Sequence, residues 1–165
     1  MTLAQQLAQY TASLQIQDVG ASVNRIINTV DDLTRQMTSL QDQLRRVPRD
    51  SAGAAVPQAL AEADGALKEL KQFRDSVLAR PLPGLGYRQY PRLREEVQTV
   101  SGMISRPMMP PTSGEMTRSG ELTGETTEAQ ARLDGIIERR VVKINDLLKG
   151  TPHVLLQAPV RAFVP

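Results

Sequence analysis

The chain has 165 residues, enough for one domain with a modest core, and its low aromatic content of 3% without Trp favours packed helices over a β-sandwich. Its 20 basic and 18 acidic residues are interspersed, which excludes a strong electrostatic attraction to nucleic acid or to a membrane surface. Cys is absent, and this excludes disulfides, thiolate metal sites and Cys nucleophiles.

Apolar residues at alternating intervals of three and four predict a long first helix over about residues 2–47. We call these apolar positions the seam, because the spacing aligns them on one side of a helix that packs against other helices. The polar residues Asn24, Arg25, Asp31 and Asp32 fall on the outer face, so the stretch is predicted to be a scaffold helix and not a site. The seam consists of Ile16, Val19, Val23, Ile26, Val30, Leu33, Met37, Leu40, Leu44 and Val47.

A second set of apolar residues precedes the seam in a different phase. Leu3, Leu7, Tyr10 and Leu14, which we call the N-terminal stripe, keep the same spacing but fail to join the seam near residues 14–17. Either the helix bends there, or its first turns face a different neighbour. The N-terminal stripe is therefore the candidate interaction surface of the chain.

A second helix is predicted over about residues 54–79 and ends at a linker with three prolines and two glycines, residues 79–91. A third, short helix over about residues 91–105 carries apolar residues at helical spacing. The inward residues of the second helix are predicted to be Val56, Leu60, Ala63, Leu67, Leu70, Phe73 and Val77, and those of the third Leu93, Val97, Val100 and Ile104.

A fourth helix is predicted over about residues 113–149. Thr112 and Glu115 have the spacing of a capping box at its start, and Gly150 and Pro152 give stop signals at its end. Residues 115–127 are rich in Gly, Ser and Thr, so we expect the helix to be weaker there. The predicted inward residues are Leu133, Ile136, Ile137, Val141, Ile144, Leu147 and Leu148.

These elements predict an all-α fold, an up-down antiparallel four-helix bundle with a short third helix and long first and last helices. A single bundle domain would cover residues 1–150. Residues 151–165 are apolar but interrupted by proline, so we expect an extended C-terminal tail that lies over the bundle or projects from it.

No catalytic, cofactor-binding or metal-binding residue is predicted. His153 is the only histidine, which leaves no plausible zinc set. Glu95 and Glu96, like Asp31 and Asp32, are adjacent on a helix and point about 100° apart, so solvated surface is expected and not a paired site. A basic cluster at residues 139–143 is open to two interpretations, a phosphate-binding patch or the cations usual near a helix C-terminus, and the second is favoured.

Several short strings resemble a known family. "VNRI" (Val23 to Ile26), the linker "PLPGLGY", "PRLREEVQTV" and "PPTSGE" (Pro110 to Glu115) stand in the order found in the C-terminal helical segment of bacterial BNR-repeat or sortilin-like β-propeller proteins, often labelled glycosyl hydrolase-like. The resemblance covers about residues 3–149. The propeller and its Asp-box are absent here, so any hydrolase activity that the resemblance implies would lie outside this chain, and no catalytic residue is carried over.

The leading hypothesis is a non-catalytic helical accessory module, the C-terminal appendage of a larger propeller protein. Its expected partner is protein, a neighbouring domain or a second copy, with no nucleic acid, membrane, cofactor or small-molecule ligand. The runner-up is a freestanding coiled-coil adaptor or homodimer in which the first helix pairs between chains through Val30 and Met37. An enzyme or cofactor-binding bundle is the third class. The N-terminus shows no export signal, although the resemblance implies an exported parent protein.

Overall fold

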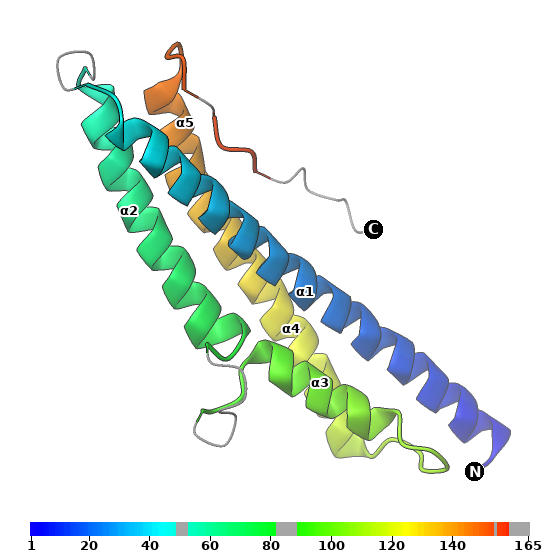
Figure 1. The fold of residues 1–165 in the computed structure, drawn as a ribbon. Helices are drawn as coiled ribbons and strands as arrows, with labels where there is room; N and C mark the ends of the chain where they lie inside the picture. The colour runs from blue at the N-terminus through cyan, green and yellow to red at the C-terminus, as the bar shows by residue number, and fades with distance from the viewer. Residues whose placement is uncertain (49–52, 82–88, 154, 159–165) are drawn as a thin grey trace. The chain divides into compact units, whose positions relative to one another are not determined.

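The computed structural model describes residues 1–48, 53–81, 89–153 and 155–158, and the regular structure in them is entirely helical. The predicted class is confirmed: four helical segments occur, the third is short, and the first and last are long (Figure 1). Their ends lie within two residues of the predicted ends. The segments are α1 (Leu3–Arg45); α2 (Ala55–Phe73) continued by η2 (Arg74–Leu78); α3 (Leu93–Ile104); and α4 (Ser113–Ile136) continued by η4 (Ile137–Val142) and α5 (Lys143–Leu148).

The chain divides into two compact units. Unit 1 comprises Met1–Ile27 and Phe73–Ala131, and unit 2 comprises Asn28–Gln72 and Arg132–Pro165. Each unit therefore contains part of α1 and part of the last helical segment, with α3 in unit 1 and α2 in unit 2. The expectation of a single domain over residues 1–150 stays a prediction.

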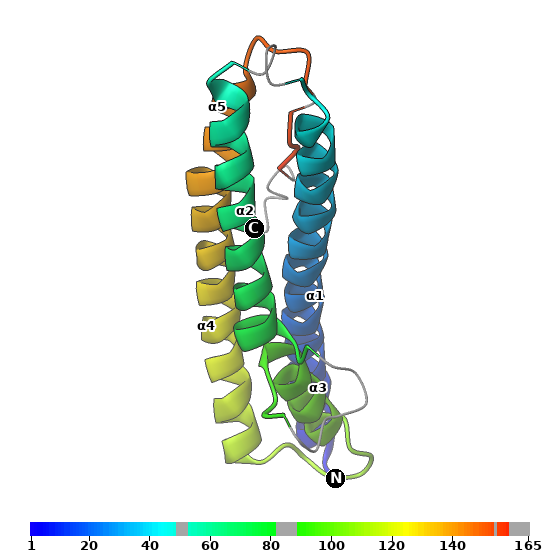
Figure 2. The same ribbon diagram turned by 60° about the vertical axis from the view of Figure 1, so that its left-hand side comes forward.

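In unit 1, α3 runs antiparallel to α1 and to α4. Gln9 of α1 bonds to the C-terminal end of α3, whereas Gly20 of α1 lies against Val97 near its start. The direction relative to α4 is also antiparallel. Glu96 near the start of α3 pairs with Arg118, whereas Arg106 after the end of α3 pairs with Glu115, which lies earlier in α4. Figures 1 and 2 both show α3 beside the N-terminal part of α1.

In unit 2, α2 runs antiparallel to η4 and α5. Glu69 near the end of α2 pairs with Arg139, and Glu62, one to two turns earlier, pairs with Lys143. On its other side α2 meets α1, where the Gln41 amide donates a 2.6 Å hydrogen bond to Asp64. Charged and amide side chains thus flank the apolar contacts of this unit.

The seam of α1 is the core of the fold. Nine of its ten residues, Ile16 to Leu44, are at most 8% exposed, and the last, Val47, is half-buried. Toward the N-terminus the same phase continues through Ala12, which is 1% exposed, and Gln9, which is half-buried. The seam therefore extends into the first turns of α1 without using the N-terminal stripe.

Two π-helical segments explain where the predicted inward residues differ from the observed ones. In η2 the buried position moves from the expected Val77 to Leu78, five residues after buried Phe73. In η4 the step from Ile136 to Val141 is also five, so Ile137 becomes only half-buried. A π turn contains one extra residue, and this extra residue shifts the phase of the helix that follows.

In α2, alanines occupy buried positions where the sequence pattern predicted leucines. Ala59 and Ala66 are fully buried, whereas Leu60 and Leu67 beside them are half-buried. The predicted inward residues of α3 are all confirmed, with exposures of 5% or less. The small alanine side chains allow a helix to approach its neighbours closely, so large apolar residues one position away reach the boundary of the core.

Candidate interaction surface

The first turns of α1 carry no charged side chain. Between Met1 and Gln17 there is no Asp, Glu, Lys or Arg, although nearly a quarter of the chain as a whole is charged. The helix begins with a capping box, in which the Thr2 backbone N–H donates to Gln5 Oε1 at 2.8 Å and the Gln5 N–H donates to Thr2 Oγ1 at 3.3 Å. The N-terminus of α1 is therefore capped by neutral side chains alone.

The N-terminal stripe lies on the solvent side of this helix. Leu3 is 81% exposed, Leu7 65%, Tyr10 62% and Leu14 44%. In the seven-residue repeat that describes the seam, these positions fall on the face opposite Gln9 and Ala12. The helix does not bend to bury them, and the stripe faces away from the rest of unit 1. The alternative that the first turns face a different neighbour stays a prediction.

Gln9 determines which face of the helix turns inward. Its side-chain amide donates to the backbone carbonyls of Ile104, Arg106 and Met109 at 2.9, 2.7 and 3.0 Å, shared between the two N–H groups. These carbonyls belong to the end of α3 and the turn after it, which would otherwise leave acceptors unsatisfied. The sequence pattern missed Gln9 because a polar residue interrupts the apolar seam, yet it lies seven residues before Ile16, in phase.

The turn after α3 carries exposed methionines and is joined to the start of α4 by an ion pair. Met108 adopts φ of +62° and is 80% exposed, and Met109 is 53% exposed. Arg106 forms an ion pair with Glu115, and the predicted capping box is confirmed, because the Thr112 N–H donates to Glu115 at 2.8 Å while the Glu115 N–H donates to the Thr112 hydroxyl at 3.2 Å. The backbone N–H of Thr112 and then the Arg106 guanidinium hold the pKa of Glu115 below its ordinary value.

A shallow polar groove of about 560 Å³ lies between α1 and α4 in unit 1. Small residues form much of its α4 side, and a Cβ added at Gly120 or Gly124 of this helix would meet nothing within 4 Å. Residues 115–127 are helical, since α4 is continuous from Ser113, and the expectation that the helix is weaker there stays a prediction. The groove is lined by Gln15, Asp18, Val19, Ser22, Met116, Ser119, Gly120, Thr123, Thr126 and Thr127.

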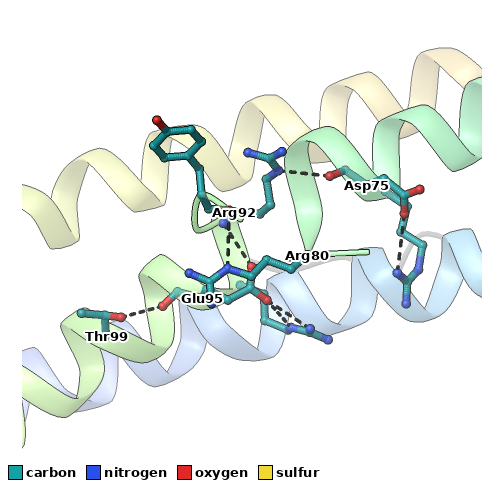
Figure 3. Close-up of polar contacts among 8 residues, drawn as sticks. Asp75, Arg80, Arg92, Glu95 and Thr99 are labelled. Atoms are coloured by element: carbon teal, nitrogen blue, oxygen red, sulfur yellow. Dashed lines mark hydrogen bonds and ion pairs between the residues drawn. The ribbon is translucent and has the colours of Figure 1, made fainter. Parts of the chain in front are cut away.

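Glu95 clasps the two ends of the linker between η2 and α3. One of its oxygens accepts the backbone N–H of Arg80 at 3.1 Å and that of Arg92 at 3.0 Å (Figure 3). The Arg92 guanidinium reaches back to the Asp75 carbonyl at 3.1 Å. The expectation of solvated surface is therefore wrong for Glu95, whose side chain is 14% exposed and has a structural role. Residues 82–88 of the linker lie outside the described residues.

The basic cluster is occupied by carboxylates of α2. Arg140 donates to Glu62 at 2.8 Å and to Glu69 at 3.2 Å, Arg139 to Glu69 at 2.7 Å, and Lys143 to Glu62 at 2.5 Å. Hydrogen bonds from Lys143 and then Arg140 lower the pKa of Glu62. These cations link helices of unit 2 through the two carboxylates.

The remaining polar candidates form local contacts. Arg25 donates to the Ser22 hydroxyl at 2.8 Å, and the His153 backbone N–H contacts Thr151. Among the residues that the structure describes, no three His, Cys, Asp or Glu side chains come together as a metal site. None of the described helices is both long and apolar enough to span a bilayer.

Comparison with protein-family models, with curated proteins and with solved structures finds no match to this chain. The resemblance to the helical segment of propeller proteins therefore stays a prediction.

Proposed function

We propose that this chain is a non-catalytic helical accessory module that docks on a neighbouring protein domain through the N-terminal stripe. One observation carries the proposal: Leu3, Leu7 and Tyr10 are each more than 60% exposed on a helix face without charge. Exposed apolar residues that lie singly need no explanation, whereas a contiguous apolar row on one face is typical of an interaction site. The opposite face of the same helix is already used by the seam.

The chemistry of this face favours protein over other partners. Nucleic acid is bound through Lys and Arg that neutralise phosphates, and amphipathic helices that lie on membranes are rich in Lys and Arg on their polar face. Neither residue type occurs between Met1 and Gln17. Depletion of charged residues together with aromatic residues such as Tyr10 is typical of the centre of a protein interface.

The neighbouring domain that we propose is a β-propeller of a larger, glycosyl hydrolase-like bacterial protein, following the resemblance of the short strings. The alternative is a freestanding coiled-coil adaptor or homodimer in which α1 pairs between chains. That alternative needs Val30 and Met37, which are 0% exposed within unit 2, to exchange their present neighbours for those of a second copy. The burial of the seam therefore favours the accessory module.

A double substitution tests the role of the stripe. Leu7→Gln with Leu14→Gln should change the free energy of unfolding of this chain by less than about 1 kcal/mol, because Leu7 is 65% exposed and Leu14 44%, and neither belongs to the buried core. Val142→Gln in unit 2, at 48% exposure, is the matched control. A loss of several kcal/mol in the double variant would contradict the proposal, because the stripe would then be part of the core of this chain.

The identity of the neighbour is tested by the reading frame upstream of Met1. We expect propeller repeats in frame, and amide exchange of residues 3–14 that is slower in the joined protein than in this chain, with the protection lost in the double variant. A different protein or none upstream would refute the propeller. A concentration-dependent dimer in light scattering, dissociated by Val30→Lys with Met37→Lys, would instead establish the adaptor.

A further inference from the structure

Two amide side chains of unit 2 clamp consecutive residues of the C-terminal tail. Asn145 of α5 accepts the Leu156 N–H at 2.8 Å and donates to the Leu156 carbonyl at 2.9 Å. Gln36 of α1 accepts the Gln157 N–H at 2.8 Å and donates to the Gln157 carbonyl at 3.1 Å. Figure 2 shows the tail leaving α5 and passing beside this part of α1.

This pairing reproduces what a β-strand does with its neighbour. A primary amide offers one donor and one acceptor side by side, so each clamp satisfies both backbone groups of one residue. Backbone pairing of this kind supplies affinity for any extended peptide, and side-chain pockets then supply the specificity. Two clamps on adjacent residues therefore form a recognition element for extended backbone.

The Gln36 side chain is also held by a contact within its own helix. The same Gln36 nitrogen donates to Asp32 at 2.8 Å, and Asp32 also accepts from Arg35 at 3.1 Å. The Asp32 contact directs the nitrogen of the amide toward the tail carbonyl and its oxygen toward the tail N–H. Asp32 thus acts as a positioning residue for the clamp, a role that the sequence pattern did not assign.

Among the described tail residues, 151–153 and 155–158, one apolar side chain is buried. Leu156 is 6% exposed, whereas Leu155 is 45% exposed and both Gln157 and Ala158 are exposed. A segment whose described residues have one buried apolar side chain and few other contacts than hydrogen bonds is expected to open easily. The tail therefore combines specific recognition with a weak hold.

We propose that Gln36 and Asn145 form a binding site for an extended peptide, and that the tail occupies this site as a displaceable internal ligand. The ligand class is an uncharged, extended protein segment with an aliphatic side chain at the place of Leu156. A tethered ligand has a high effective concentration, so the tail blocks the site until a segment of a partner protein competes with it. This proposal concerns unit 2 and is independent of the N-terminal stripe.

The first test measures binding of a peptide to the full chain with its tail released. The probe is a labelled peptide, acetylated and amidated, with the sequence of residues 153–160, and the variant is Leu156→Asp. We expect the variant chain to bind the peptide at least about tenfold more tightly than the unaltered chain, because the internal competitor is lost. A peptide carrying the same Leu156→Asp change should bind neither chain.

The second test removes the clamps. In the Leu156→Asp chain, Gln36→Ala and Asn145→Ala should each weaken peptide binding by about tenfold or more, because each removes two charge-free hydrogen bonds. Gln43→Ala and Asn28→Ala, which change exposed amides of the same helix, are the matched controls and should leave it unchanged. Gln157→Pro, which deletes one clamped N–H and keeps Leu156, provides a second released chain should Leu156→Asp fold poorly.

Three results would overturn the proposal. The peptide could bind neither released chain, could bind released and unaltered chains equally, or could bind the clamp variants as well as their controls. Each would mean that the contacts of Leu156 and Gln157 pack the tail without forming a site.

Discussion

The same two long helical segments pass through both units, yet they present different residues in each. In unit 2 the core positions of α1 are Val30, Leu33, Met37, Leu40 and Leu44, all at most 2% exposed. In unit 1 the corresponding inward positions begin with Gln9 and Ala12, and the buried positions of α4 include Ser119 and Thr126. The first turns of α1 in turn carry their large apolar residues outside, in the N-terminal stripe, although unit 1 buries others such as Ile16, Phe73 and Leu122.

Under the proposed function, this difference separates stability from recognition along one helix. Large buried apolar side chains contribute most of the free energy of folding, so the part of α1 that lies in unit 2 is expected to contribute more to stability than its first turns. Small or polar residues in a core and large apolar residues in water both contribute little to stability. The exposed apolar face has an explanation if it binds a partner. The predictions below probe this contrast, beginning with the largest expected effect.

Truncating a large apolar side chain should lower the free energy of unfolding far more in the seam than in the N-terminal stripe. Leu33→Ala should lower the free energy of unfolding by about 2–5 kcal/mol, because it leaves a cavity at a site that is 0% exposed. Leu7→Ala, the matched change at 65% exposure, should cost less than about 1 kcal/mol. Chemical denaturation measures both, and equal losses would remove the distinction between seam and stripe.

Gln9→Ala should destabilise unit 1 by about 1–3 kcal/mol, because three backbone carbonyls lose their donor. Amide exchange in residues 105–112 should become faster, whereas exchange in residues 30–44 should not change. Gln6→Ala, at an exposed position of the same helix, is the control. If exchange instead rises equally throughout the chain, Gln9 is not a local anchor.

Gly120→Ala and Gly124→Ala should each stabilise the chain by about 0.5–1 kcal/mol, because Ala favours the helix and the added Cβ meets no atom within 4 Å. Gly150→Ala should act in the opposite direction, since its φ of +80° suits glycine. Thermal unfolding reports all three. Destabilisation by the helical pair would show that this face of α4 is already covered in solution.

Acid should weaken the ion pairs of unit 2 by a small amount. The pKa of Glu62 is lower in the folded chain than in the unfolded one, so its contribution is present above about pH 4.3, the ordinary value for Glu, and is lost as the pH falls through the folded pKa. Glu62→Gln should therefore reduce the fall in melting temperature between neutral pH and this acidic range. An unaltered pH profile in the variant would mean that the pairs with Arg140 and Lys143 contribute nothing measurable.

Signals within a few residues of sequence were enough to predict the helices, but they did not predict the contacts between segments that are distant in the sequence. The capping box at Thr112 and the seam of α1 follow from spacings of a few residues, and both are confirmed. The phase shifts in η2 and η4 were missed because no residue type marks a π turn. The inward position of Gln9 could have been found by extending the seam phase by seven residues, but its carbonyl partners lie 95 to 100 residues away.

The sequence by itself determined that this protein is all-α, where its four helical segments begin and end, and which face of α1 is buried, because these depend on the period of the helix and on its termini. Only the tertiary structure decided that the N-terminal stripe faces water, that Glu95 clasps a linker, and that Gln36 and Asn145 hold the tail. A polar side chain acquires such a role from the backbone groups that packing brings within hydrogen-bond distance, and residues 121 positions apart, as Gln36 and Gln157 are, share no local pattern.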